Sequence, residues 1–106
     1  MRINNRDARE YVKARKPFMG SNLYGVTTQT GEFRQYVVYS YNTPMYVYED
    51  GEEFVNKERY SVTTSKHMTQ IGVRNRGIPL DGREMSMLTL LGARLFKKRS
   101  VEKALS

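Results

Sequence analysis

Two tyrosine-rich runs separated by a turn constrain the fold of this chain more than any other feature. The first, FRQYVVYSY at 33–41, is partly apolar on both alternating faces, which is typical of a central strand packed on two sides. The second, MYVYE at 45–49, repeats the pattern after the turn formers of 41–44. Asp50-Gly51 marks another tight turn before a short strand at 53–56. These signals predict an antiparallel meander.

Shorter elements are predicted on both sides of this meander. Asn4 can cap a helix over about 5–16, which Pro17 ends. The glycine-rich stretch that follows leaves room for a brief strand at 23–28. A short helix is predicted at 65–71, just before a loop that begins with Gly72.

The longest predicted helix covers about 81–105. Asp81 and Glu84 fit a capping box at its start. Its apolar residues recur at helical spacing, and we expect Leu91 to be a core residue; the stripe comprises Met85, Leu88, Leu91, Leu95 and Phe96, widened by Met87 and Leu90. The predicted fold class is α+β. It has an N-terminal helix, an antiparallel meander of three to four strands, a short helix near 65–71 and a long C-terminal helix packed on the sheet, in a single domain of residues 1–106.

Positive charge gathers at the two ends of the chain, which has 106 residues and a net charge of +7. Residues 1–20 contain six Lys/Arg and two Asp/Glu, and residues 66–106 contain nine Lys/Arg and three Asp/Glu. Residues 21–65, in contrast, contain three Lys/Arg and six Asp/Glu. Clustered cations suit phosphate backbones or an acidic protein surface. The alternative is that both ends are solvated helix faces that keep the protein soluble.

The composition argues against several classes of protein. The chain has no cysteine and one histidine, so we expect no disulfide, no thiolate nucleophile, no metal site and no cofactor. The acids between Glu49 and Glu58 lack the spacing of a calcium loop and surround a turn, where acids are common. No apolar run approaches the roughly 18 residues of a membrane span, and no signal peptide is evident, so we expect no membrane partner.

His67 is the only histidine and lies among hydroxyl residues in YSVTTSKHMTQI. Three interpretations remain open: a general base beside a serine or threonine, a contact with a binding partner, or a hydrogen-bonded packing residue. The loop from Gly72 to Gly77 places two arginines between glycines and could approach a charged surface. Tyr36, Tyr46 and Tyr48 could stack on bases if they shared a solvent face, although strand tyrosines usually pack in a core.

Two segments, EYVKARKPFMGSNLYG and YVVYSYNTPMYVYEDGEEFVNKERYSVTTSKHMTQI, carry a family resemblance over about residues 10–71. The chain resembles a family of small uncharacterised proteins of bacteriophages and mobile elements, a domain of unknown function. The resemblance implies an accessory protein in the cytoplasm of a bacterial host cell, without known catalytic residues. It also implies one polar surface or hydrogen-bond network, formed by Ser21, Asn22, Thr64, Ser65, His67 and Gln70. The C-terminal helix lies outside the resemblance.

The leading functional expectation is a non-enzymatic phage accessory protein that binds a host nucleoprotein or nucleic-acid-handling machine, including inhibition of host defence. The alternatives are direct DNA or RNA binding with low sequence preference, a small His67-dependent hydrolase or nuclease, and self-association through the C-terminal helix. No catalytic residue is assigned. The expected binding residues are Arg6, Arg9, Lys13, Lys16, Ser21, Asn22, Thr64, Ser65, Lys66, His67, Gln70, Arg74, Arg76, Lys97, Lys98 and Arg99.

Overall fold

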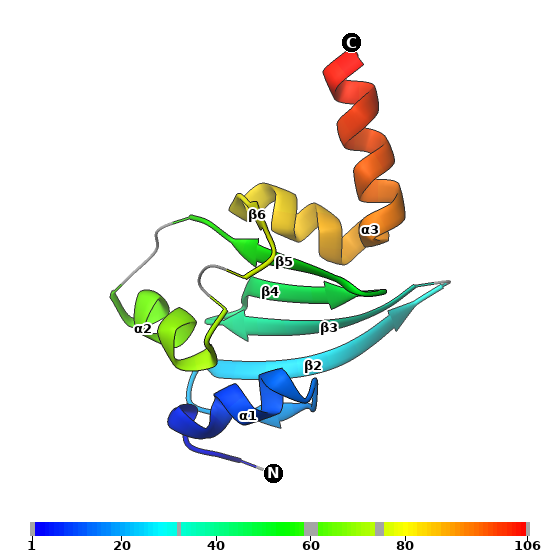
Figure 1. Ribbon diagram of the computed structural model, residues 1–106. Coiled ribbons are helices and arrows are strands. Elements are labelled where there is room, and N and C mark those ends of the chain that lie inside the picture. The colour runs from blue at the N-terminus through cyan, green and yellow to red at the C-terminus, as the bar shows by residue number, and fades with distance from the viewer. Residues whose placement is uncertain (1, 32, 59–61, 74–75, 106) are drawn as a thin grey trace.

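A six-stranded sheet forms the centre of the protein in the computed structural model, which describes residues 2–31, 33–58, 62–73 and 76–105 (Figure 1). The strands lie in chain order and are antiparallel, except that β6 runs parallel to β5. The strands are β1 (Phe18–Met19), β2 (Leu23–Thr30), β3 (Phe33–Ser40), β4 (Thr43–Glu49), β5 (Glu52–Asn56) and β6 (Ile78–Leu80). The helices are the 3-10 turn η1 (Asn5–Asp7), α1 (Ala8–Lys13), α2 (Val62–Ile71) and α3 (Gly82–Leu105). The α+β class is therefore confirmed.

Tight turns fix the register of the central strands. Tyr41 and Asn42, with φ angles of 50° and 66°, join β3 to β4 by a two-residue connection. Asp50 and Gly51, with φ angles of 53° and 84°, join β4 to β5 in the same way. Positive φ at both turn residues matches the twist of the flanking strands. The predicted hairpin and the Asp50-Gly51 turn are confirmed.

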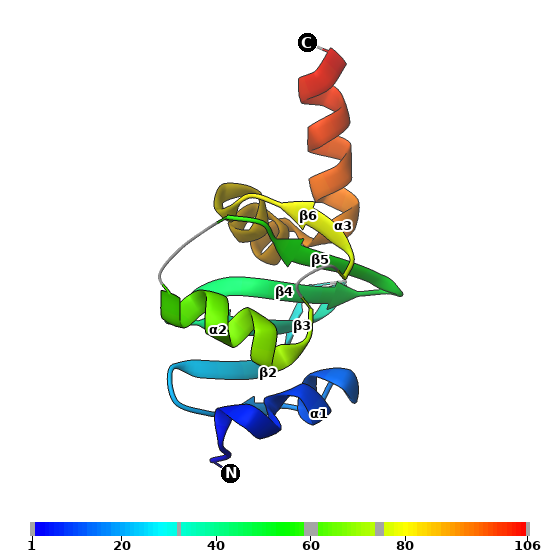
Figure 2. The ribbon, with the colours of Figure 1, turned by 60° about the vertical axis from the view of Figure 1, so that its left-hand side comes forward.

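Each face of the sheet has its own hydrophobic core, as the two apolar faces of residues 33–41 predict. One face packs against α1 and α2, and its buried residues include Tyr36, Val38, Tyr46, Val55, Ala8, Val12, Met68 and Ile71. The other face packs against α3 through Val37, Val47, Phe54, Met85, Leu88 and Phe96. Figure 2 shows α1 and α2 on one side of the sheet and the start of α3 on the other. The protein thus has three layers.

Several predicted bounds differ from the structure. The sheet has six strands rather than three or four, because β1 and β6 extend it at its two edges. The N-terminal helix is shorter than expected, and Asn4 makes no side-chain capping hydrogen bond. The short helix begins at Val62 rather than at residue 65. The two additional strands are only two and three residues long and carry no alternating pattern.

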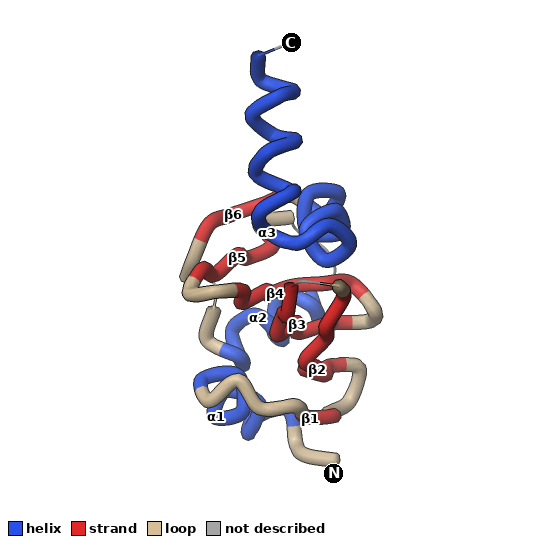
Figure 3. Tube along the Cα trace, turned by 90° about the vertical axis from the view of Figure 1, so that its right-hand side faces the viewer, coloured by secondary structure: helices blue, strands red, loops and turns tan. Residues whose placement is uncertain are grey.

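The capping box of α3 is confirmed, but the helix is not continuous. Asp81 Oδ1 accepts from the Glu84 N–H at 2.7 Å, and Glu84 Oε1 accepts from the Asp81 N–H at 3.0 Å. At Gly92 the backbone leaves helical geometry, with φ 81° and ψ 159°. The part that follows projects away from the sheet (Figures 1 and 3).

Buried polar side chains hold this break in α3. The Ala93 N–H donates to both carboxylate oxygens of Glu49, at 2.9 Å to Oε1 and 3.0 Å to Oε2. Glu49 thus provides an acceptor for a backbone N–H in the first turn of the projecting part. Gln35 donates to the Leu88 carbonyl at 2.9 Å and to Glu49 at 2.7 Å. Because of this break, the prediction that one apolar stripe runs along the whole helix is wrong. The side chain of Leu90 is 73% exposed and that of Leu95 is 52% exposed, whereas Phe96 is buried. Leu91, expected in the core, is only half-buried.

Candidate functional site

His67 lies inside the molecule, between α2 and the sheet, with only 3% of its surface exposed. Its Nδ1 atom lies 2.7 Å from Ser40 Oγ on β3. Its Nε2 atom lies 3.3 Å from Asn5 Nδ2 in η1. The ring of Tyr41, in the β3–β4 turn, stacks on the imidazole with a centroid distance of 5.9 Å. His67 therefore links α2 to η1 and to the end of β3, which are distant in the sequence.

The hydrogen bonds around Asn5 determine the tautomer of His67. The Ser21 N–H can only donate, so the Asn5 oxygen accepts it at 2.8 Å, and the Asn5 amide nitrogen faces the other way. That nitrogen donates to the Ser21 carbonyl at 3.0 Å and to His67 Nε2. Nε2 must then be the acceptor, which leaves the proton on Nδ1, where it is donated to Ser40 Oγ. This pattern requires a neutral imidazole.

The surroundings of His67 favour the same neutral state. Burial lowers the pKa of His67 below its ordinary value, and the positive charge of Lys66 lowers it further. A proton added to Nε2 would also meet the N–H of Asn5 instead of an acceptor. Both ring nitrogens already have partners within the protein, so this histidine is arranged to position other groups.

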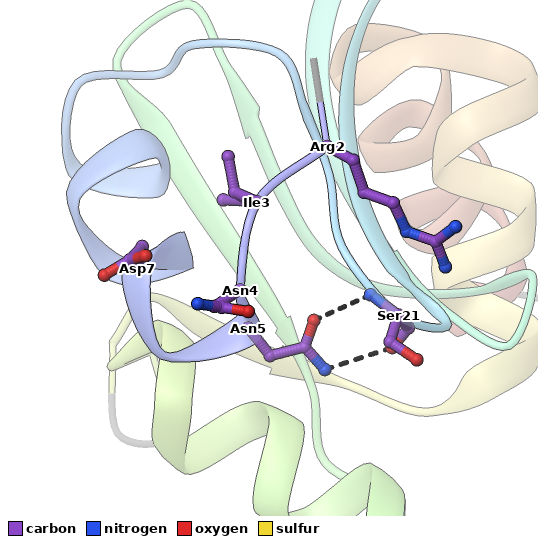
Figure 4. A pocket seen from close by; sticks show the side chains of 6 residues that line it. All are labelled: Arg2, Ile3, Asn4, Asn5, Asp7 and Ser21. Atoms are coloured by element: carbon purple, nitrogen blue, oxygen red, sulfur yellow. Dashed lines mark hydrogen bonds between the residues drawn. The ribbon is translucent and has the colours of Figure 1, made fainter.

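An open pocket of about 700 Å³ lies beside this polar network (Figure 4). It is lined by Arg2, Ile3, Asn4, Asn5, Asp7 and Ser21. Figure 4 shows the Asn5 side chain held against Ser21, so its amide is occupied by internal hydrogen bonds. Gly20 makes this approach feasible, because a Cβ there would lie 2.3 Å from Asn5 Oδ1.

The structure brings together only part of the polar surface expected from the resemblance. Ser21 and His67 are linked through Asn5, which was not among the binding residues predicted from the sequence. Asn22 is exposed in the β1–β2 turn, and Gln70 is half-buried. The side chains of Thr64 and Ser65 lie outside the described residues. Because His67 is buried, it would affect a partner only through the residues that it positions.

Most of the predicted basic contacts lie on the surface. Arg74 and the side chain of Arg99 lie outside the described part of the chain. Arg76 is paired with Glu53 at 2.8 Å, and this bond raises the pKa of the Arg76 guanidinium. Lys97 is paired with Glu52, and Arg9 donates to the Thr69 carbonyl. The exposed residues are Arg6, Arg9, Lys13, Lys16, Lys66, Arg76, Lys97 and Lys98.

A second pocket, of about 350 Å³, contains basic residues that the sequence reading missed. It combines Arg15, from the end of α1, with Arg34 of β3 and Tyr48 of β4. The Arg15 guanidinium carbon lies 3.7 Å from the centre of the Tyr48 ring. Tyr36 and Tyr46 are buried, so of the three candidate stacking tyrosines only Tyr48 is partly exposed. The sequence signals were an arginine just before the Pro17 that ends the helix, and the alternation that puts Arg34 and Tyr36 on one face of their strand.

Residues 2–31, 33–58, 62–73 and 76–105 form neither a cluster of metal-ligand side chains nor a membrane-spanning helix. No group of three or more His, Cys, Asp or Glu side chains there is placed to hold a metal ion. No helix in the same ranges has both the length and the apolar character needed to cross a membrane.

Comparison with known proteins identifies the family of this chain. Residues 7–85 match the model of a family of unknown function, DUF8033, and the chain therefore belongs to that family. The match covers the sheet, α1, α2 and the first turn of α3, and so extends beyond residues 10–71 on both sides. No match to a curated protein or to a solved structure was found.

Proposed function

We propose that this DUF8033 protein is a non-enzymatic protein that binds nucleic acid through phosphate contacts, with low sequence preference. The supporting observation is the set of exposed cations near its two ends. Among the described residues only two basic side chains, Arg76 and Lys97, pair with carboxylates. The exposed cations that have no such pair with a described carboxylate include Arg6, Lys13, Lys16, Arg94 and Lys98. Such cations are available to displace counterions from phosphates.

The environment of His67 supports binding over hydrolysis. A general base needs a ring nitrogen that can reach a substrate proton. Both nitrogens of His67 are engaged, with Ser40 and with Asn5, and the ring is buried. If a His67→Ala protein that remains folded lost a nuclease activity present in the natural protein, the hydrolase alternative would be favoured instead.

Fluorescence anisotropy of a labelled single-stranded 20-mer, at low salt, tests this function. The natural protein should bind, and a Lys97→Gln/Lys98→Gln/Arg99→Gln protein should bind at least about tenfold more weakly, because several phosphate contacts are lost. Glu52→Gln is a matched control, since it removes the carboxylate beside Lys97 and should bind at least as tightly as the natural protein. The absence of any anisotropy change with single-stranded or duplex DNA or RNA would refute the function.

A second candidate is binding to a host nucleoprotein as a phage accessory protein, with inhibition of host defence as one outcome. It is favoured by the part of α3 that projects from the sheet (Figure 3), because Arg94 and Lys98 in this part are exposed. Affinity capture from a nuclease-treated bacterial lysate tests it. A protein partner that survives nuclease and is lost with Arg94→Glu/Lys98→Glu would support this candidate, whereas capture that disappears with nuclease would indicate direct nucleic-acid binding.

A further inference from the structure

The pocket containing Arg15, Arg34 and Tyr48 lies on the sheet face that packs against α1 and α2. Tyr36 of β3 and Tyr48 of β4 are register partners on this face. Arg34 lies two residues before Tyr36 on β3 and so falls on the same face, and Asp50 lines the pocket from the turn that follows β4. Thr27 of β2, the register partner of Tyr36, is exposed at the side of the pocket. The pocket therefore gathers groups from three adjacent strands and from the end of α1.

Arg15 occupies this pocket in a backbone conformation that is unfavourable for arginine. It follows the end of α1 with a φ of 53°, in the left-handed region. Its N–H donates to the Val12 carbonyl at 3.1 Å, and the Lys16 N–H donates to the Tyr11 carbonyl at 2.8 Å. This is a Schellman motif, in which glycine is the usual residue at the left-handed position. An arginine there keeps its guanidinium over Tyr48 at the expense of backbone strain.

Among the residues that the structure describes, no carboxylate forms an ion pair with either arginine of the pocket. Arg15 stacks on the Tyr48 ring, and Arg34 has no carboxylate within ion-pair distance in the part of the chain that the structure describes. Asp50 lines the same pocket without pairing to either of them. The pocket thus offers two guanidinium groups, the Asp50 carboxylate and the Thr27 hydroxyl to a ligand.

We infer that this pocket binds one nucleotide unit of a single-stranded nucleic acid. This inference rests on the proposed function. The Arg15 guanidinium, backed by Tyr48, presents its outer face to a base, and Arg34 contacts the phosphate. Asp50 or the Thr27 hydroxyl accepts a hydrogen bond from an N–H group of the base.

The chemistry of the pocket distinguishes this ligand from other anions. A base brings N–H groups that the carboxylate of Asp50 can accept, whereas the carboxylate side chains of an acidic peptide offer it no donor. A duplex keeps its bases paired and stacked, so the face of a base cannot reach Arg15. A volume of about 350 Å³ falls within the range of small-molecule sites, which suits one nucleotide.

Two substitutions in the pocket, compared with one outside it, test this inference. The probe is a labelled octathymidylate in the anisotropy assay, with an abasic octamer of equal charge for comparison. Arg34→Gln and Arg15→Gly should each weaken octathymidylate binding about tenfold. Arg83→Gln removes an exposed arginine from α3, on the other face of the sheet, and should weaken binding less than about twofold. All three residues are exposed, and thermal melting checks that each variant is folded.

The two ligands and the control separate the outcomes. The abasic octamer should bind the natural protein about tenfold more weakly than octathymidylate, and Arg15→Gly should change abasic binding no more than Arg83→Gln does. If octathymidylate binds but the pocket variants behave like Arg83→Gln, the inference is wrong while the proposed function stands. Equal affinity for both octamers would also overturn the inference about the pocket. If the natural protein binds neither octamer nor any longer nucleic acid, both are refuted.

Discussion

Arg15 shows how a single residue can be kept against its own backbone preference. A non-glycine residue in the left-handed region is strained by about 1–2 kcal/mol, and the end of α1 would accept glycine there. The guanidinium gains a stacking contact with Tyr48, worth roughly 0.5–1 kcal/mol at an exposed site. The contact offsets only about half of the strain, so Arg15 is not kept for stability, and its side chain is available to serve the pocket.

We expect Arg15→Gly to be about 1 kcal/mol more stable than Arg15→Ala. Both variants lose the contact with Tyr48, but only alanine keeps a Cβ in the left-handed conformation. Urea denaturation of the two variants measures the difference in the free energy of unfolding. If the glycine variant is the less stable of the two, Arg15 does not have the strained conformation described above.

His67 makes stability depend on pH. Its pKa in the folded protein is lowered from 6.5, the ordinary value, mainly by burial and also by Lys66. Below 6.5 the unfolded chain therefore binds more protons than the folded protein at this group. The contribution to stability is fully present above pH 6.5 and is lost as the pH falls through the folded value.

The matched variant for this pH effect is His67→Gln, which does not titrate. Its free energy of unfolding should change less between pH 7.5 and 5 than that of the natural protein, which should fall more steeply. Urea denaturation at several pH values gives both curves, and the carboxylates contribute equally to each. Parallel curves would show that His67 is not held neutral by Asn5 and Ser40.

At the scale of elements, the break in α3 depends on residues far away in the sequence. Gly92 has a φ of 81° and a ψ of 159°, a region that is essentially restricted to glycine. A Cβ there would lie 2.8 Å from the Phe33 ring. Glu49 and Gln35 satisfy the backbone groups on the two sides of the break, so the strands determine the direction of the projecting part.

Gly92→Ala should therefore lower the free energy of unfolding by about 3 kcal/mol, because the strained backbone and the clash with Phe33 add together. Gly31→Ala is the matched control, since its φ is also positive, at 57°, but a Cβ there meets nothing within 4 Å. It should cost only about 1 kcal/mol. Equal losses for the two variants in urea denaturation would contradict the packing at the break.

The elements that could be predicted from the sequence are those with local signals. The alternation of 33–41, the Asp50-Gly51 turn and the Asp81–Glu84 capping box each lie within a few residues, and all three were predicted correctly. β6 is a three-residue strand that pairs with β5, and the paired residues are more than 20 positions apart in the sequence. The break at Gly92 was missed for the same reason, because its cause is Glu49 and Phe33.

At the scale of the whole molecule, folding brings together basic residues that the sequence separates. The charge counts identify two basic ends, but they do not show that Arg15 and Arg34 share a pocket on the face opposite α3. The aromatic run was predicted mainly as core, and Tyr36 and Tyr46 are buried, where burial raises the pKa of both phenols. Tyr48 alone of the three is left to support a ligand contact.

The measurement that most directly tests binding through phosphates is the salt dependence of the affinity for a single-stranded 20-mer. Each phosphate neutralised contributes a slope of about −0.7 to the plot of log K against log salt concentration, so about four contacts give a slope near −3. We expect this slope for the natural protein and a shallower one when Lys97, Lys98 and Arg99 are neutralised. An affinity that does not change with salt, or no binding at the lowest salt concentration, would contradict the proposed function.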